Sequence, residues 1–242
     1  MLRILVTNDD GIGASQLPEL ARWCQKLGHV TVVAPKVEQS AKSHGITLRH
    51  AFEAKQVADL VPGIECWAVD STPADCVRFA VLGLHRQFDL VISGINKGLN
   101  IGTDVLYSGT AAAVFEAGIL GLPGVALSVK PENYDTATEH LDRILEYFTR
   151  HSLLEKCSHW NVNIPPQGGS IRITRQGGPY YSDDFPHIGN DLYQPTGKMI
   201  YKDRQDLSLD TDACMAGYIS VSPITIKRTH WEAYDALKGL NE

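Results

Sequence analysis

The stretch Leu2–Gly13, which reads L-R-I-L-V-T-N-D-D-G-I-G, decides the fold of this chain. Its apolar, branched beginning, Leu2–Val6, is typical of a strand that is buried on both faces of a sheet. Two adjacent carboxylates, Asp9 and Asp10, follow this strand at a glycine-rich turn. Residues 14–27 then have apolar side chains at helical spacing. This order of strand, turn and helix predicts that both aspartates lie at the carboxyl end of a strand, where open α/β sheets bind their ligands.

The acidic pair has several possible meanings. Two adjacent carboxylates repel each other unless something offsets their charge, and a divalent cation is the simplest candidate. A single Asp after a strand more often caps the following helix, but one cap needs only one side chain. An acidic pair in this position also occurs in phosphate-receiver domains and in other phosphate-handling α/β folds. The pair therefore indicates metal or phosphate chemistry without deciding between these classes.

Composition excludes several kinds of protein. The 242 residues are 43% hydrophobic and 21% charged, which is ordinary for a globular protein. The formal net charge of -6 argues against a nucleic-acid polymer as partner, because such binders normally present a basic face. Five cysteines without a C-x-x-C pair disfavour disulfide and zinc-ribbon frameworks, and free thiols indicate a reducing compartment. With no visible signal peptide and no apolar run of roughly 20 residues, the sequence predicts a cytoplasmic protein without a membrane partner.

Strands and helices alternate through about residue 150, which predicts an α/β fold with a Rossmann-like, mostly parallel sheet and helices on both faces. The expected strands after the first span residues 29–34, 64–69, 88–93 and 124–129, and a further extended piece spans residues 46–52. The expected helices after the first span residues 74–84, 111–120 and 134–149.

The pattern changes in the C-terminal third. Residues 168–212 are rich in Gly, Pro, Tyr and Asp and show no clear long helix, which predicts hairpins or an extended arm. Strand-like pieces remain at residues 161–165, 170–174 and 218–222. A helical pattern at 230–240 predicts a closing helix. We interpret residues 1–242 as a single domain with a turn-rich oligomerisation arm at about 168–229.

Oxygen-bearing side chains follow three strands of the predicted sheet at its carboxyl edge. They are Asp9, Asp10, Ser40 and Asn96. Oxygen ligands favour a hard cation such as Mg²⁺ or Mn²⁺, whereas zinc favours His and Cys. The two carboxylates would balance the charge of the cation and leave coordination positions for water and substrate.

Two segments could hold an anion beside this cation. The loop Asn96–Asp104 is rich in glycine, which allows backbone amides to approach a ligand closely. Ser108, Gly109 and Thr110 precede the helix at 111–120, and a helix N-terminus offers free N–H groups to phosphate. The alternative is that Ser108 or Thr110 simply caps the helix. A metal beside an anion site is the equipment for phosphoryl transfer to water.

Six stretches of the sequence follow one another in a specific order. They are N-D-D-G (Asn8–Gly11), A-P…Q-S (Ala34–Ser40), T-P-A-D-C-V (Thr72–Val77), S-G-I-N-K-G-L-N-I-G-T-D (Ser93–Asp104), Y-S-G-T (Tyr107–Thr110) and N-V-N-I-P (Asn161–Pro165). In this order and spacing they resemble the survival protein E (SurE) family of nucleotidases. The resemblance covers at least residues 2–165. Ala41, Ser71, Ala111 and Ala112 depart from the family pattern; none is a ligand, so they bear on loop geometry and substrate preference.

The resemblance implies a function. The chain would be a metal-dependent phosphomonoesterase, a 5'-nucleotidase that hydrolyses nucleoside 5'-monophosphates by attack of metal-activated water. Nucleoside 3'-monophosphates and short polyphosphate are further implied substrates. The residues themselves leave two rivals open: Asp9 as a covalent nucleophile, and a receiver-like or nucleotide-sensing module that binds without turnover. A receiver would carry a phospho-accepting Asp after the strand at 88–93, and this chain offers Ser93 and Asn96 there.

The resemblance also implies a cofactor and an assembly. One divalent metal cation per subunit, Mg²⁺ or Mn²⁺, would be bound by the residues that the family uses as ligands, Asp9, Asp10, Ser40 and Asn96. Asp9, Asp10 and Asn96 would be catalytic, and Ser108, Gly109 and Thr110 would hold the substrate phosphate. The family region that corresponds to the arm packs between subunits, which implies a homodimer or homotetramer.

Overall fold

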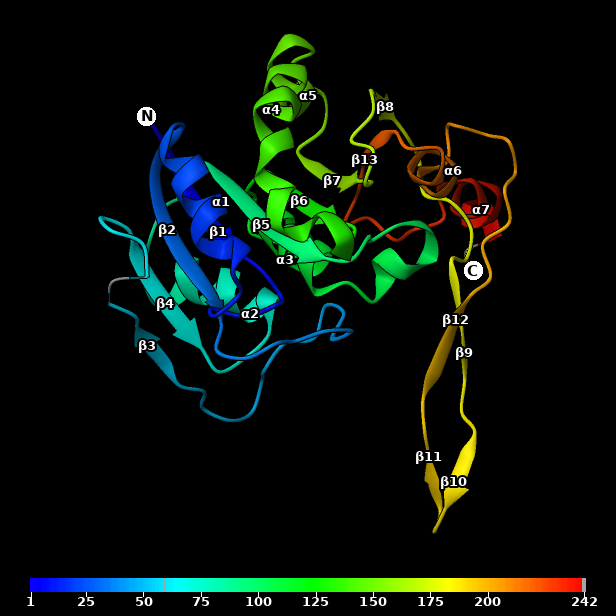
Figure 1. Cartoon of the computed structure of the whole chain (residues 1–242), viewed down its shortest axis with the longest axis horizontal. Coiled ribbons are helices and arrows are strands. Elements are labelled where there is room, and N and C mark those ends of the chain that lie inside the picture. Colours follow the sequence, from blue (N-terminus) through cyan, green and yellow to red (C-terminus); the bar gives the residue numbers. More distant parts are fainter. Residues whose placement is uncertain (59, 241–242) are drawn as a thin grey trace.

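A nine-stranded sheet organises the part of the chain that the computed structural model describes, residues 1–58 and 60–240 (Figure 1). Its strands, in spatial order, are β3 (Ala54–Gln56), β4 (Glu65–Val69), β2 (Gly28–Pro35), β1 (Leu2–Thr7), β5 (Leu90–Lys97), β6 (Gly124–Val129), β7 (His159–Ile164), β13 (Ile219–Pro223) and β8 (Ile171–Ile173). Neighbours from β4 to β7 run parallel, whereas β3 and β13 run antiparallel to β4 and β7. The predicted α/β class with a mostly parallel sheet is therefore confirmed.

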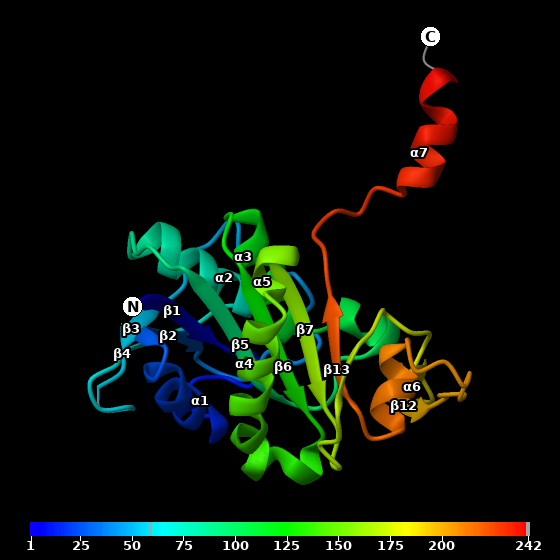
Figure 2. The same cartoon turned by 90° about the horizontal axis from the view of Figure 1, so that it is seen from above.

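Helices cover both faces of this sheet. The α-helices of the described residues are α1 (Gln16–Gln25), α2 (Pro73–Arg78), α3 (Gly109–Ile119), α4 (Leu141–Arg150), α5 (Leu153–Lys156), α6 (Asp210–Met215) and α7 (Trp231–Leu237), of which α7 does not pack on the sheet. The alternation of side chains along β1 supplies two cores, because Ile4 and Val6 pack with α1 and α4 while Leu5 packs with α2 and α3. All three side chains are fully buried. Figure 2 shows α1 on one side of the sheet and α2 and α3 on the other.

The order of strands reverses at β1. β2 lies on one side of β1, and β5, which comes much later in the chain, lies on the other. A crevice opens outside the carboxyl ends of the strands at such a switch point. Asp9 and Asp10 follow β1, Ser40 follows β2, and Asn96 is the penultimate residue of β5. The topology therefore brings all four expected ligands to one crevice.

Several predicted elements differ from the observed ones. The helix predicted at 74–84 is α2 followed by a π-helical turn at Phe79–Gly83, and the helix predicted at 134–149 is the 3-10 helix Pro131–His140 followed by α4. The extended piece predicted at 46–52 is not a strand, and the edge strand lies later, at β3. Within the segment 46–52, a backbone N–H bonds to a side chain instead of to a neighbouring strand: Thr47 N donates to Asp75 Oδ2, at the start of α2, at 2.7 Å.

The strand-like pieces predicted at 170–174 and 218–222 are β8 and β13. Both lie within the arm predicted at 168–229, yet they extend the sheet: β13 pairs with β7 and β8 pairs with β13, and Ile219 and Val221 of β13 are completely buried. α6 is a short buried helix that no pattern indicated. The projecting arm is therefore narrower than predicted. It consists of β9 (Tyr181–Asp184) paired with β12 (Thr196–Met199), and β10 (His187–Gly189) paired with β11 (Leu192–Tyr193) at the tip (Figure 1).

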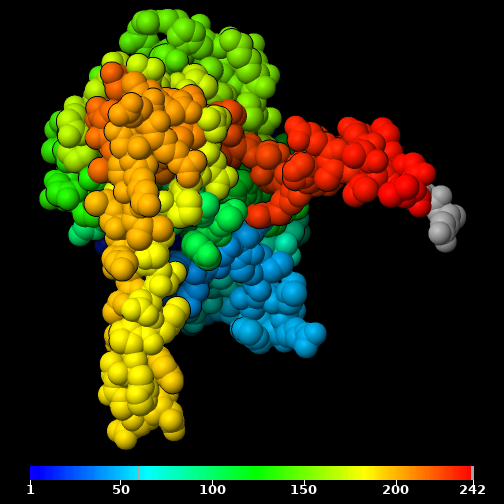
Figure 3. All heavy atoms as spheres, turned by 90° about the vertical axis from the view of Figure 1, so that its right-hand side faces the viewer, coloured from blue at the N-terminus to red at the C-terminus, as the bar shows by residue number. Residues whose placement is uncertain are grey.

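The C-terminal helix is present but does not close onto the domain. α7 and the 3-10 turn Lys238–Leu240 contain no buried residue, and Figures 2 and 3 show the helix projecting from the body. Trp231, Tyr234 and Leu237 are each more than half exposed. The prediction of a closing helix at 230–240 is therefore wrong about its packing, because helical spacing predicts an apolar face and does not identify what covers it.

Candidate active site at the switch point

A cavity of about 650 Å³ opens at the carboxyl edge of the sheet. The four side chains predicted as metal ligands all line it: Asp9, Asp10, Ser40 and Asn96. Ser108 lines it as well, and Gly109 and Thr110 follow Ser108 at the start of α3. The structure thus brings the expected metal ligands and the expected phosphate residues to one place.

The turn after β1 is closed by Asn8. Its Oδ1 accepts from Gly11 N at 3.1 Å and its Nδ2 donates to Gly11 O at 2.9 Å. Gly11 has φ +96, and a Cβ there would lie 3.1 Å from the carbonyl carbon of Val37, so this position suits glycine. Gln39 N donates to Asp9 O at 2.7 Å. This bond attaches the Ser40 loop to the turn that contains Asp9 and Asp10.

Asp9 is a buried carboxylate. It is 5% exposed, and Thr110 Oγ1 donates to its Oδ1 at 2.5 Å. Burial raises the pKa of Asp9 from 3.8 to about 6; the charge of Asp10 adds to the rise, and the hydrogen bond from Thr110 opposes it. Thr110 therefore positions Asp9, a role that its place in the sequence did not indicate.

Asp10 is half-buried beside Lys97, which is the one basic side chain in the cavity lining among the described residues. Lys97 N donates to Asp10 Oδ2 at 3.3 Å. Burial raises the pKa of Asp10, and the charge of Glu38 raises it further, while the backbone bond and the charge of Lys97 lower it. Five carboxylates share the cavity lining with this single lysine: Asp9, Asp10, Glu38, Asp104 and Asp183. A phosphate dianion would be repelled by such a lining unless a cation accompanied it.

The remaining two expected ligands are oriented by local bonds. Asn96 Nδ2 donates to Gly98 O at 2.9 Å, which leaves its Oδ1 available to a cation, and Ser40 Oγ donates to Glu38 Oε1 at 2.5 Å. Among the described residues, no group of three or more His, Cys, Asp or Glu side chains is placed to hold a metal ion. The candidate set instead combines two carboxylates with an amide and a hydroxyl. Such all-oxygen donors fit Mg²⁺ or Mn²⁺ better than zinc.

The N-terminus of α3 divides its residues between structural and binding roles. Ser108 Oγ accepts from Ala111 N at 3.0 Å, so Ser108 is the helix cap that the alternative reading expected. Within the described chain, the backbone N–H of Gly109 donates to no acceptor outside the helix. That N–H group and the Ser108 hydroxyl remain available to an oxyanion at the positive end of the helix.

The loop Asn96–Asp104 does not supply the free amides expected from its glycines. Most of its backbone N–H groups donate to protein acceptors: Lys97 to Asp10, Gly98 to Val129, Asn100 to Asn163, Gly102 to Asp210, Thr103 to Gly178 and Asp104 to Ile101. The glycines serve backbone geometry instead, since Gly98 and Gly102 have φ +146 and +57. The start of α3 is therefore the better candidate for the phosphate.

Buried asparagines bond to the loop Asn96–Asp104. The carbonyl of Asn100, a residue that lines the cavity, accepts from Asn161 Nδ2 at 2.8 Å and from Asn163 Nδ2 at 3.1 Å. Asn163 Oδ1 accepts from Asn100 N at 2.8 Å, and Asn100 Nδ2 donates to Ser128 Oγ at 2.8 Å. The N-V-N motif, Asn161–Asn163, had no predicted role. The signal was present, because residues two apart on a strand share one face.

Replacing Asn161 by Asp tests this network. The change removes the N–H donor to Asn100 O and places a carboxylate oxygen against a carbonyl in a site that is 1% exposed. We expect the free energy of unfolding to fall by about 1–3 kcal/mol and kcat to fall roughly tenfold, since loosened positioning of a catalytic loop costs rate. Denaturant titration and phosphate release measure the two effects.

Ser222→Ala is the matched control, because the Ser222 hydroxyl bonds Thr174 Oγ1 and has no bond to Asn100. It should leave kcat unchanged. An Asn161→Asp protein with the wild-type kcat would show that the network does not position the loop.

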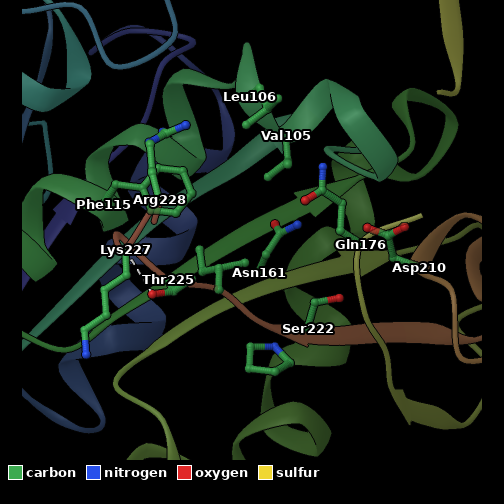
Figure 4. Close-up of a pocket in the computed structure, with 12 residues that line it drawn as sticks. Val105, Leu106, Phe115, Asn161, Gln176, Asp210, Ser222, Thr225, Lys227 and Arg228 are labelled. Carbon is green, nitrogen blue, oxygen red and sulfur yellow. Dashed lines mark hydrogen bonds between the residues drawn. The ribbon is translucent and has the colours of Figure 1, made fainter. Parts of the chain in front are cut away.

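A second cavity, of about 250 Å³, lies between α3, β7 and β13 (Figure 4). Arg228 lies against Phe115 on one side, with 5.9 Å from the guanidinium carbon to the ring centroid, and Asp210 lies on the opposite side. The carboxylate of Asp210 already accepts three backbone N–H groups, from Gly102, Gly177 and Thr211. None of the predicted ligands lines this cavity, so the candidate chemistry belongs to the first one.

Comparison with known proteins gives consistent similarities. The family model described as survival protein SurE matches residues 4–183. A 5'-nucleotidase SurE from Alkaliphilus metalliredigens is 41% identical over 255 residues, covering 99% of each chain. A 5'-nucleotidase SurE from Thermosipho melanesiensis is 40% identical over 253 residues, covering 100% of this chain and 97% of its own. The crystal structure of a SurE protein from Aquifex aeolicus superposes with a TM-score of 0.79 at 29% identity, covering 99% of this chain and all of that one.

Proposed function

The chain belongs to the survival protein SurE family, and from that membership we propose that it is a 5'-nucleotidase, a phosphoric monoester hydrolase that releases phosphate from nucleoside 5'-monophosphates with the help of a divalent cation. Relatives named 5'-nucleotidase SurE, similar along the whole chain, support the enzyme class. The single structural observation that carries the metal dependence is the acidic pair beside the N-terminus of α3 in a cavity lined by one lysine.

The cation would be held by two carboxylates, an amide and a hydroxyl, from Asp9, Asp10, Asn96 and Ser40. When bound, a divalent cation neutralises phosphate charge and makes water a stronger nucleophile. Asp9 and Asp10 also orient the attacking water, and one of them accepts its proton. The Gly109 N–H and the Ser108 hydroxyl bind phosphate oxygens, and Lys97 adds positive charge. Water attacks phosphorus in line, and the nucleoside leaves with its oxygen, which takes up the proton that the carboxylate accepted.

Removal and return of the metal test this function. We expect chelation to lower phosphate release from nucleoside 5'-monophosphates at least about a hundredfold, and Mg²⁺ or Mn²⁺ to restore it. A cavity this open at a sheet edge should accept several bases and act more weakly on generic phosphate esters. A malachite-green assay over a nucleotide panel measures both. Rejection of every nucleotide alongside rapid turnover of a sugar phosphate would contradict the proposal.

Two rivals have separate readouts. If Asp9 were a covalent nucleophile, acid quenching during turnover would trap a phosphoenzyme; we expect none. If the protein were a nucleotide sensor, calorimetry would detect nucleotide binding without phosphate release. Extension of the assay to nucleoside 3'-monophosphates and short polyphosphate tests the broader range, which we include in the proposal.

The proposed setting is the cytoplasm, without a nucleic-acid polymer or membrane as partner. The five cysteines are unpaired, as in a reducing compartment. No helix among the described residues is long and apolar enough to cross a membrane.

We also propose a homodimer or homotetramer. The projecting hairpin exposes Phe185, Ile188, Leu192 and Tyr193 at its tip, each by more than half, which is unusual for a surface that stays in water. Replacing residues 185–195 by Asn-Gly would join Asp184 to Thr196, which already pair across the hairpin, and spare the part of β9 that lines the cavity. We expect this variant to lose the assembly in light scattering. A monomeric parent protein at micromolar concentration, or an intact assembly after the deletion, would contradict the proposal.

A further inference from the structure

Part of the wall of the 650 Å³ cavity lies outside the proposed metal-binding and phosphate-binding residues. This second wall is formed by residues of the 3-10 helix Gly102–Leu106 and its C-terminal neighbour, and by the base of the hairpin: Thr103, Asp104, Tyr107, Tyr181, Asp183 and Gly197. The hairpin therefore does more than project from the domain, since its first strand closes one side of the cavity.

The charges of the cavity fall into two separate groups. Asp10 lies close to Glu38 and Lys97. Asp104 instead lies close to Asp183, and burial together with the charge of Asp183 raises its pKa. The cavity thus has one end at the acidic pair and another between the 3-10 helix and β9. A nucleoside monophosphate also has two ends, because its phosphate and its base are attached to different carbons of the ribose.

The second end presents aromatic surface. Tyr107 is 60% exposed and Tyr181 is 51% exposed, although both line the cavity. Tyr181 is held edge-on by Tyr180, with ring centroids 4.9 Å apart and an interplanar angle of 81°, and Tyr180 is itself buried. A ring that is fixed by a buried neighbour and still open to the cavity is pre-organised to stack on a planar ligand.

We propose that Tyr107 and Tyr181 form the base subsite of the enzyme, and that Asp104 and Asp183 accept hydrogen bonds from hydroxyl or N–H groups of the nucleoside. This inference rests on the proposed function and names the part of the substrate that the second wall reads. Every nucleobase has an aromatic face, so a stacking site tolerates all of them. Such a subsite would favour nucleotides of every base over phosphate esters that lack a base.

Tyr181→Ala and Tyr107→Ala test the subsite with four nucleoside 5'-monophosphates and with ribose 5-phosphate, which has no base. We expect each variant to raise KM for the nucleotides about tenfold, the loss expected for one base–aromatic stack, with little change in kcat. KM for ribose 5-phosphate should not move. Tyr181→Phe, which keeps the ring, should retain the wild-type KM for nucleotides.

Tyr234→Ala is the matched control. Tyr234 is 52% exposed on α7, contacts the Trp231 ring and does not line the cavity, so its removal should leave every KM unchanged. Unchanged nucleotide KM in both alanine variants, or an equal rise in KM for ribose 5-phosphate, would overturn the base subsite. Failure of the proposed function is distinct, because the wild-type protein would then release phosphate from no nucleotide.

Discussion

Asp9→Asn is expected to lower phosphate release roughly 10²–10⁴-fold and to stabilise the metal-free protein at neutral pH. Asn nearly keeps the shape of Asp, and its Oδ1 still accepts the bond from Thr110 Oγ1, which spans 2.5 Å in the native protein. What it removes is one of the two negative charges that would hold the cation and direct the water. Metal affinity, measured by calorimetry, should fall together with turnover.

The stabilisation has a definite pH dependence. The folded protein raises the pKa of Asp9 from 3.8 to about 6, so this group contributes stability that is complete below about pH 4 and is lost as pH rises through about 6. At pH 7 the ionised, buried carboxylate lowers the free energy of unfolding by about 3 kcal/mol. The melting temperature of Asp9→Asn should therefore exceed that of the wild type at pH 7.5 without metal, and the difference should disappear near pH 4.

Asp89→Asn should have the opposite effect on the melting temperature. Asp89 bonds Arg3 at 2.6 Å on the surface, and these bonds lower its pKa to about 2. Asp89→Asn should slightly lower the melting temperature at pH 7.5 and leave turnover unchanged.

If Asp9 were only a helix cap, Asn would replace it without loss, because Asn caps about as well as Asp. Near-normal turnover of Asp9→Asn would thus refute the metal site.

Gly109→Ala is expected to lower turnover about a hundredfold, the cost of displacing a catalytic group by about 1 Å. A Cβ at Gly109 would lie 2.8 Å from Asp9 Cβ and 3.0 Å from Asp9 Oδ2, and 3.1 Å from Pro73 Cγ. The start of α3 and Asp9 must therefore move apart, which lengthens the bond to Thr110 and shifts the Gly109 N–H. The helix itself should not suffer, because Ala is the better helix former.

Gly13→Ala is the control for Gly109→Ala. Gly13 belongs to the turn after β1, its φ is not positive, and a Cβ there meets nothing within 4 Å. Its turnover should equal that of the wild type. Steady-state kinetics with and without saturating Mg²⁺ measure both variants, and a fully active Gly109→Ala protein would show that α3 does not need this close approach.

The sequence was informative where function depends on the end of a strand. Parallel strands carry their carboxyl ends to one edge, so the places of Asp9, Asp10, Ser40 and Asn96 followed from local patterns alone. The sequence did not predict hydrogen bonds between distant segments: Asn161 and Asn100 are 61 residues apart, and Thr110 and Asp9 are 101 residues apart. Such pairs depend on how elements pack, which periodicity does not encode. For the same reason the sequence predicted the arm without predicting that Tyr181 closes the cavity.

The register of β1 has a consequence for the order of events in folding. Leu2 pairs with Gly28 in β2, whereas Ile4 pairs with Leu90 in β5. The second contact closes a far longer loop, and non-local parallel pairing of this kind forms slowly. A nascent chain that ends before β5 already contains Asp9, Asp10 and Ser40, yet it has no Asn96 and no α3 to complete the site. Cation binding at the proposed site would therefore follow completion of the sheet, and it could not guide the folding of the early chain.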